Sequence, residues 1–354
     1  MRRKYLDNIR WMTVVLVVVY HVFYMYNAAG IPGGVGAFSK TQKQDAVLYV
    51  LYPWFMLLLF VVSGMSARFH LESHSEKDFL RQKTTKLLVP STIGLFVFWW
   101  ILGYFNVKIG GGLAAMQGVP KPVLYLIFCV SGTGPLWYIQ LLWLYSVFLI
   151  AFRRFEKDTL WKHGQKANLA VLLLCGVLVW AGANVGNVPV ITVYRFGIYG
   201  VGYFLGYFVL SHDTVIDRLK KAYLPLGAAA VALGTAFTVF FWGKPYAEHS
   251  VLDTPLCNAY AWIAVLAILA CMKRWVDREN CFTRFMCRKA WGLYLFHYLP
   301  LAVCALYLYP TSLPATLKYW LSALAAFGGA LLLYEVIRRI PFLRWCVCGF
   351  KKKT

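Results

Sequence analysis

The sequence predicts an all-α integral membrane protein of about ten transmembrane helices with both termini in the cytoplasm. Three observations lead to this fold class. Of the 354 residues, 60% are hydrophobic and only 14% are charged, whereas a soluble domain carries roughly 25% charged residues. The apolar residues occur in long runs, and short basic segments separate them. The chain is also long enough for roughly ten spans of about 20 residues each with short loops.

Composition and charge exclude several other classes of protein. A water-soluble enzyme would need more charged residues, and a disordered chain would hold far fewer apolar and aromatic ones. The formal net charge of +22 fits a nucleic-acid binder, but the hydrophobicity does not, so we expect no nucleic-acid partner. The nine cysteines are scattered without a C-x-x-C pair, which indicates neither a disulfide framework nor a metal site.

Apolar runs that end at charged or turn residues give the predicted spans, and we expect one transmembrane domain over residues 1–354 with a basic cytoplasmic tail at 335–354. A shorter run, Val123–Val130, cannot cross a bilayer and is predicted to be an interfacial or re-entrant piece. The predicted spans are Ile9–Tyr26, Val47–Gly64, Leu88–Phe105, Leu136–Phe152, Ala167–Ala183, Ile191–Leu210, Tyr223–Trp242, Pro255–Met272, Ala290–Tyr309 and Ala315–Tyr334.

The distribution of basic residues predicts the orientation. An even number of spans places both termini on one side, and the segments on that side, together with Arg10 at the mouth of the first span, hold 29 of the 36 Lys and Arg residues. Cytoplasmic loops carry the excess of Lys and Arg in membrane proteins. We therefore expect cytoplasmic termini and a positive cytoplasmic face that attracts anionic lipids or an anionic substrate.

Ionisable side chains inside spans are costly and mark candidate sites. On the first helix, which begins just before the span, Asp7, Arg10, Val14, Val17 and His21 lie on one face, because spacings of three and four residues align side chains along a helix. Arg10 and His21 stand about 16 Å apart along the axis, so we expect Arg10 at the cytoplasmic mouth, paired with Asp7, and His21 past the bilayer middle. Alone, Arg10 can be a snorkelling anchor and His21 a packed core histidine; together they favour a site.

A second basic group lies near the inner end of the second span. Arg68 follows the small residues Ser63 and Gly64, which allow another helix to approach closely. An arginine there can hold a phosphate through two hydrogen bonds. Lys83 and Lys86 are near in sequence, although a basic stretch of this kind also forms interfacial helices on anionic lipid.

Four further residues are candidates for the functional site, and each of them also has a simple structural explanation. His297 lies inside the ninth span and is either a packed helix–helix histidine or part of a catalytic site. Arg195, near the outer end of the sixth span, either contacts an anion on the outer face or snorkels. Trp137 and Tyr138 open the fourth span and are either belt aromatics or substrate contacts.

Short motifs in order along the chain resemble those of the membrane acyltransferase-3 family. The most specific is Tyr5-Leu-Asp-Asn-Ile-Arg10 followed, after ten residues, by His21. Together the motifs extend over nearly the whole chain. The others are Phe60-Val-Val-Ser-Gly-Met-Ser-Ala-Arg68, Pro135-Leu-Trp-Tyr138, Phe204-Leu-Gly-Tyr207 and Leu293-Tyr-Leu-Phe-His297.

The resemblance implies a ten-helix O-acyltransferase of a bacterial plasma membrane. Such proteins take an acyl group, usually acetyl, from cytoplasmic acyl-CoA and deliver it to a hydroxyl of an extracytoplasmic cell-envelope carbohydrate. The opening is also similar to the periplasmic-glucan succinyltransferase branch, so acetyl and succinyl both stay open. Some members carry an extra extracytoplasmic esterase-like domain, which we do not expect here, because the chain ends soon after the tenth predicted span.

The candidate residues fit this chemistry. CoA carries several phosphates, for which Arg10 and Arg68, with Lys83 and Lys86, are the predicted contacts. A hydroxyl is a poor nucleophile and needs a base with a pKa near neutrality, which histidine supplies. His21 would either deprotonate the acceptor in a ternary complex or carry the acyl group itself. The sequence leaves these two mechanisms open.

Two other functions and one other acyltransferase fold compete with this interpretation. A secondary transporter also uses Arg, His and Glu in spans, but it predicts inverted repeats and broken helices that the sequence does not clearly show. A different membrane acyltransferase fold places its histidine late in the chain, where His297 lies. A non-enzymatic lipid-linked or sensory protein is supported only by the basic face. The acceptor and the oligomeric state stay open, with a homodimer as one alternative.

Overall fold

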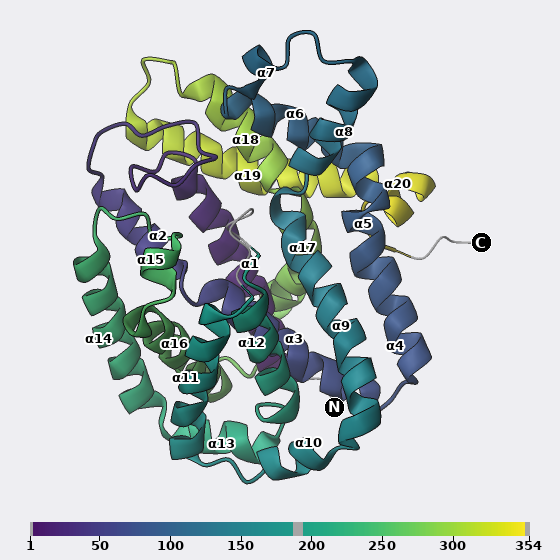
Figure 1. The fold of residues 1–354 in the computed structure, drawn as a ribbon, viewed down its shortest axis with the longest axis vertical. Helices are drawn as coiled ribbons and strands as arrows, with labels where there is room; N and C mark the ends of the chain where they lie inside the picture. The colour runs from purple at the N-terminus through teal and green to yellow at the C-terminus, as the bar shows by residue number, and fades with distance from the viewer. Residues whose placement is uncertain (1–2, 187–193, 351–354) are drawn as a thin grey trace. The chain divides into compact units, whose positions relative to one another are not determined.

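A computed structural model describes residues 3–186 and 194–350 (Figure 1). The described residues form helices and no β-strand, which confirms the all-α architecture. The chain divides into two compact units. Unit 1 comprises Met1–Thr13, Ala46–Leu80 and Leu144–Arg288, and unit 2 comprises Val14–Asp45, Arg81–Trp143 and Lys289–Thr354.

Some helices contribute residues to both units, and the others belong to one. The shared helices are α1 (Lys4–Tyr24), α4 (Glu76–Lys83), α9 (Trp137–Glu156) and α17 (Cys281–Phe296). The helices of unit 1 alone are α2 (Ala46–Leu51), α3 (Phe55–Leu71), α10 (Thr159–Gly164), α11 (Leu169–Asn184), α12 (Phe196–Phe208), α13 (Asp213–Lys221), α14 (Tyr223–Phe241), α15 (His249–Leu252) and α16 (Pro255–Trp275).

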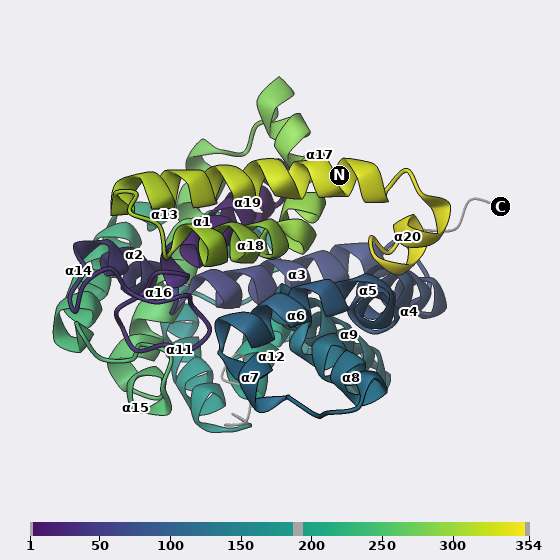
Figure 2. The ribbon, with the colours of Figure 1, turned by 90° about the horizontal axis from the view of Figure 1, so that it is seen from above.

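Unit 2 contains several short helical turns besides its longer helices. Figure 2 shows α18 and α19 of this unit lying side by side. Its elements are η1 (Lys43–Asp45), the π-helical turns η2 (Thr84–Leu88) and η3 (Leu95–Trp99), α5 (Val89–Ser91), α6 (Trp100–Ile109), α7 (Gly112–Ala115), α8 (Lys121–Ser131), η4 (Gly134–Leu136), α18 (Tyr298–Leu308), α19 (Ala315–Ile337) and α20 (Pro341–Cys346).

Local capping residues fix where helices of unit 1 begin. The Asn168 side chain accepts a hydrogen bond from the backbone N–H of Val171 and starts α11. Thr254 caps α16 in the same way, and Pro255 takes the first helical position. Both arrangements satisfy backbone donors that a helix start leaves without a partner inside the helix.

Glycines bring α3 and α12 of unit 1 into backbone contact. A Cβ added to Gly64 would lie 1.9 Å from the carbonyl oxygen of Tyr203, and one added to Gly206 would lie 2.1 Å from that of Val61. Small residues allow this approach between membrane helices. The predicted close approach at Gly64 is therefore confirmed, and it sets the position of Arg68 at the end of α3.

The described residues contain seven helical stretches that are long and apolar enough to cross a membrane, or up to eight if one bent pair counts as a span. Each coincides with a predicted span. The ten-span count is not confirmed, because α11 has only 16 residues and α12 only 13, with the start of the predicted span 191–210 lying outside the described residues. The run 123–130 forms the 11-residue helix α8, too short to span, as predicted.

The ninth predicted span is broken at His297. Helix α17 ends at Phe296, α18 begins at Tyr298, and their axes differ by 54°. Pro300, in the first turn of α18, has no N–H to donate to the carbonyl of Phe296, so one helical hydrogen bond across the break is missing. The break places His297 at a bend instead of inside a straight helix.

Candidate active site

Unit 2 brings two histidines from distant parts of the chain into contact. His21 lies on α1 and His297 lies at the bend between α17 and α18. Nε2 of His297 is 3.1 Å from Nδ1 of His21. The ring of His297 is completely buried, whereas that of His21 is half-buried. The sequence identified both residues but not their contact.

The neighbours of the two rings determine which nitrogen atoms carry protons. Nδ1 of His297 lies 3.0 Å from the carbonyl oxygen of Leu293 and 2.8 Å from that of Tyr294. Carbonyl oxygens only accept, so in the neutral ring Nδ1 carries the proton and Nε2 is an acceptor. Nδ1 of His21 faces this acceptor and also lies 2.8 Å from the carbonyl oxygen of Val17. It must therefore carry the proton of His21.

This arrangement leaves Nε2 of His21 as a lone-pair acceptor. Both hydrogen-bond contacts of the His21 ring are made through Nδ1, and no residue in the described parts of the chain forms a hydrogen bond with Nε2. The edge of the Tyr298 ring borders His21, with ring centroids 5.0 Å apart. A histidine oriented through one nitrogen and open at the other is the usual form of a general base or nucleophile.

Aromatic residues on α17 extend from this pair. Trp291, Tyr294 and His297 follow each other at intervals of three residues and therefore share a face of the helix. Trp291 and Tyr294 are stacked with centroids 6.1 Å apart. Lys86 lies over the Trp291 ring at 5.2 Å. Lys86 is exposed and Lys83 is half-exposed at the end of α4.

The two aromatic candidates at the start of α9 lie next to this face. Tyr138 meets Tyr294 edge to face, with centroids 5.6 Å apart, and Trp137 packs against Tyr138. The Tyr294 hydroxyl donates to the carbonyl oxygen of Pro135 and ties the start of α9 to α17. Tyr138 thus contacts Tyr294, the ring that in turn contacts His297.

Arg10 lies in unit 1 and makes the predicted pair with Asp7. Its Nη1 donates to Asp7 at 2.7 Å, and its Nη2 donates to the hydroxyl of Ser66 on α3. The guanidinium side chain is still 38% exposed. Arg10 is therefore oriented by two partners while it keeps access to a ligand.

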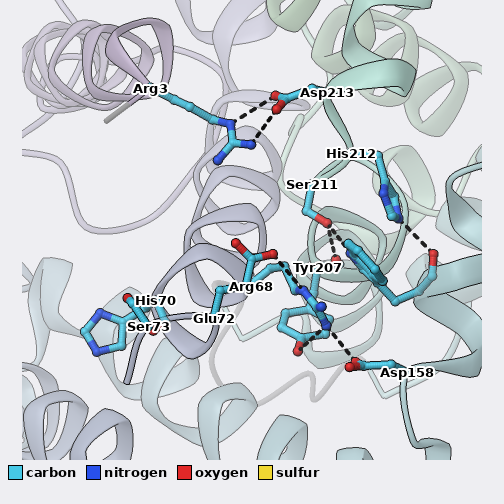
Figure 3. Close-up of polar contacts among 11 residues, drawn as sticks. Arg3, Arg68, His70, Glu72, Ser73, Asp158, Tyr207, Ser211, His212 and Asp213 are labelled. Atoms are coloured by element: carbon cyan, nitrogen blue, oxygen red, sulfur yellow. Dashed lines mark hydrogen bonds and ion pairs between the residues drawn. The ribbon is translucent and has the colours of Figure 1, made fainter. Parts of the chain in front are cut away.

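Arg68, also in unit 1, is far more enclosed. Its side chain is 10% exposed and lies between two carboxylates, with Nη1 donating to Asp158 at 2.6 Å and Nε to Glu72 at 3.2 Å (Figure 3). Its guanidinium also stacks 3.8 Å over the Trp161 ring. A phosphate would have to compete with both carboxylates for this side chain.

The cluster around Arg68 continues to the segment after α12. The Trp161 indole donates to the hydroxyl of Ser211 at 3.0 Å, and the His212 ring donates from Nε2 to the Trp161 carbonyl oxygen at 2.8 Å. Burial lowers the pKa of His212, and the positive charge of Arg68 acts in the same direction. Close by in Figure 3, Arg3 forms an ion pair with Asp213 at 2.7 Å.

Arg195 occupies a different part of unit 1, directly before the first residue of α12. Its side chain is buried, its Nη2 donates to the carbonyl oxygen of Leu252 at 3.4 Å, and the guanidinium also contacts the side chain of Tyr199. Among the described residues, no cluster of three or more His, Cys, Asp or Glu side chains has the arrangement of a metal site.

The sequence as a whole matches one known family. Residues 3–335 match a family model described as an acyltransferase domain, that of the acyltransferase-3 family. The chain belongs to the acyltransferase-3 family. Comparisons with curated proteins and with solved structures give no match. The resemblance of the motifs is thus confirmed over nearly the whole chain, and the protein is a membrane acyltransferase.

In this acyltransferase-3 protein the predicted residues fall into separate groups. Unit 2 holds the histidine pair with the aromatic residues and the two lysines, and unit 1 holds Arg10, Arg68 and Arg195. Sequence reasoning missed Tyr294, although its spacing of three residues from His297 placed it on the same helical face. It also missed Asp158 as a partner of Arg68, for which no local pattern gives a signal.

Proposed function

We propose that this acyltransferase moves an acyl group from cytoplasmic acyl-CoA to a hydroxyl of an extracytoplasmic cell-envelope carbohydrate, with His21 as the reacting histidine. The observation that carries the proposal is the 3.1 Å contact between Nε2 of His297 and Nδ1 of His21. His297 accepts from Nδ1 of His21, which leaves the lone pair of His21 Nε2 for the reaction.

In the first form of the mechanism His21 acts as a general base. Its Nε2 takes the proton of the acceptor hydroxyl while that oxygen attacks the thioester carbonyl. The C–S bond then breaks, and Nε2 returns the proton to the departing thiolate of CoA. His297 keeps accepting from Nδ1 and so stabilises the positive charge on the His21 ring in between.

In the second form His21 acts as a nucleophile. The same lone pair attacks the thioester carbonyl and CoA leaves as the thiolate. The acceptor oxygen then takes the acyl group from Nε2, and its proton passes to the thiolate, which leaves as CoA thiol. His297 has the same part in both forms, because Nδ1 of His21 has to carry its proton whenever Nε2 reacts. Detection of acyl groups bound to the protein distinguishes the two.

The donor contacts are proposed for exposed cations. Arg10 is oriented by Asp7 and Ser66 and remains partly exposed, which suits a phosphate of CoA. Lys83 and Lys86 would add positive potential. For Arg68 we propose a positioning part, since Asp158 and Glu72 already neutralise it.

The acceptor contacts are proposed for the aromatic residues at the start of α9. Trp137 and Tyr138 provide flat apolar rings next to Tyr294, and such rings pack against the apolar faces of sugars. We propose acetyl or succinyl as the acyl group, the bacterial plasma membrane as the location, and anionic lipids as neighbours of the basic surface.

Sealed membrane vesicles of both orientations test this function. Inside-out and right-side-out vesicles that contain cell-envelope carbohydrate are prepared. Radiolabelled acetyl-CoA or succinyl-CoA is added to the external medium, and the label in the carbohydrate is counted. We expect label only where the donor meets the cytoplasmic face, and none in vesicles with His21→Ala. Absence of acyl-CoA turnover in wild-type vesicles of both orientations would refute the proposal.

A further inference from the structure

A buried guanidinium in unit 1 has no carboxylate partner among the residues that the structure describes. Arg195 is 4% exposed, and no carboxylate within the described ranges forms an ion pair with it. Among the described residues it contacts the Leu252 carbonyl oxygen, at 3.4 Å, and the side chain of Tyr199. Its Nε atom is buried without a hydrogen-bond partner. An uncompensated buried charge is strongly unfavourable, so a native protein rarely keeps one without a function.

A second buried group without a partner lies beside Arg195. Asn258 of α16 is 1% exposed, and its Nδ2 donates to the same Leu252 carbonyl oxygen, at 2.8 Å. Because one oxygen accepts from both side chains, Arg195 and Asn258 are neighbours. The Oδ1 atom of Asn258 is buried and has no partner. The two groups are complementary, since one can only donate and the other still needs a donor.

The start of α12 adds to the positive potential at this place. Arg195 directly precedes the first helical residue of α12, Phe196, and α12 has 13 residues. The N–H groups in the first turn of a helix have no partner inside the helix and favour anions. The positive potential of the helix start adds to the charge of the guanidinium, close to the two buried atoms that lack partners, Nε of Arg195 and Oδ1 of Asn258.

We propose that Arg195 and Asn258 form a binding site for an anionic phosphate or carboxylate group that also carries a hydroxyl. The guanidinium donates from Nε to an anionic oxygen of the ligand, and Asn258 Oδ1 accepts from the hydroxyl. A phospholipid headgroup and a soluble anion both present this chemistry. The site goes beyond acyl transfer, and a binding measurement can test it whether or not the transfer reaction is correct.

Inorganic phosphate is a suitable probe because at neutral pH it carries both anionic oxygens and a hydroxyl, whereas sulfate carries only the oxygens. The thermal unfolding midpoint of delipidated protein in detergent is measured against the concentration of each anion. We expect saturable stabilisation by phosphate, weaker binding of sulfate, and a half-saturating phosphate concentration at least about tenfold higher in Arg195→Gln. Arg154→Gln, which removes an exposed arginine of the same unit, should behave as the wild type.

Two further measurements distinguish anion binding by Arg195 and Asn258 from a purely structural role of these residues. Without anion, Arg195→Gln should unfold at the wild-type midpoint or above it, because it removes an uncompensated charge. Asn258→Ala should bind phosphate and sulfate equally. An anion-independent wild-type midpoint, or equal phosphate effects in wild type and Arg195→Gln, would overturn the site, and equal binding of both anions by the wild type would overturn the part of Asn258.

Mass spectrometry of the protein released from membranes identifies the source of the anion. Phospholipid retained by the wild type and lost from Arg195→Gln supports a headgroup as the ligand. Equal lipid retention in both proteins, with the phosphate effect lost only in Arg195→Gln, supports a soluble anion. Both results require the same Arg195 contact.

Discussion

Nε2 of His297 lies 3.1 Å from Nδ1 of His21, although the two histidines are 276 positions apart in the chain. The carbonyl oxygens of Leu293 and Tyr294 hold the other nitrogen of His297. In each neutral ring the proton therefore lies on Nδ1, and Nε2 of His21 is left as the reacting atom. His297 is a positioning residue in this arrangement.

Replacement of His297 tests that positioning. His297→Ala removes the acceptor of the His21 Nδ1–H, so we expect kcat for acyl transfer to fall by about 10²-fold or more with an unchanged KM for acyl-CoA. His297→Gln keeps an acceptor and a donor at similar reach and should retain more activity. Steady-state kinetics of both variants give the answer. Equal kcat losses in the two variants would show that the hydrogen-bond acceptor for the His21 Nδ1–H does not determine kcat.

Replacement of Arg10 tests the donor contact. Arg10→Gln removes a partly exposed charge, so KM for acyl-CoA should rise about tenfold while kcat changes little. The unfolding free energy should drop by less than about 1 kcal/mol, as for other exposed ion pairs. Arg339→Gln, which removes an exposed arginine, is the matched control. If the KM values of both variants equal that of the wild type, Arg10 is only an anchor.

Arg68 should behave differently from Arg10, because it is enclosed by Asp158, Glu72 and Trp161. Arg68→Ala leaves Asp158, which is 33% exposed, without its cation, and we expect a loss of about 1–3 kcal/mol in unfolding free energy. Arg68→Lys keeps the charge but loses the flat stacked group, so its loss should be intermediate. Denaturant unfolding measures both. Wild-type stability of Arg68→Ala combined with a raised KM for acyl-CoA would instead identify a donor contact.

Stability should depend on pH through His212. Burial lowers the pKa of this ring in the folded protein, so the unfolded chain binds a proton more readily near the ordinary histidine pKa of about 6.5. Stability contributed by the neutral ring is present above that pH and is lost as the pH falls below it. Thermal unfolding between pH 8 and pH 5 should show this slope, and His212→Gln should flatten it. An unchanged slope in His212→Gln would assign the effect to other groups.

The helices were predictable because their signal is local. Long apolar runs between basic segments located each of the seven stretches that can cross a membrane. The bend at His297 was not predicted, although Pro300 marks the place where a helical hydrogen bond is lost. Tertiary packing decides whether such a proline bends a helix or ends it, and that packing cannot be derived from the pattern of residues along one helix.

The candidate site was predictable only within single helices. The pair Asp7–Arg10 follows from a spacing of three residues and is confirmed. The contacts of His21 with His297 and of Arg68 with Asp158 join residues 276 and 90 positions apart. No pattern within a helix predicts such contacts, because they depend on how the helices pack. The sequence therefore identified the ionisable residues and the structure supplied their partners.

Initial rates of acyl transfer in four proteins test the central claim most directly: wild type, His21→Ala, His297→Ala and the double variant. We predict that His21→Ala falls to the background rate and that the double variant is no slower, because residues that act as one unit do not give additive losses. Transfer by His21→Ala at the wild-type rate would contradict the assignment of His21 as the reacting histidine.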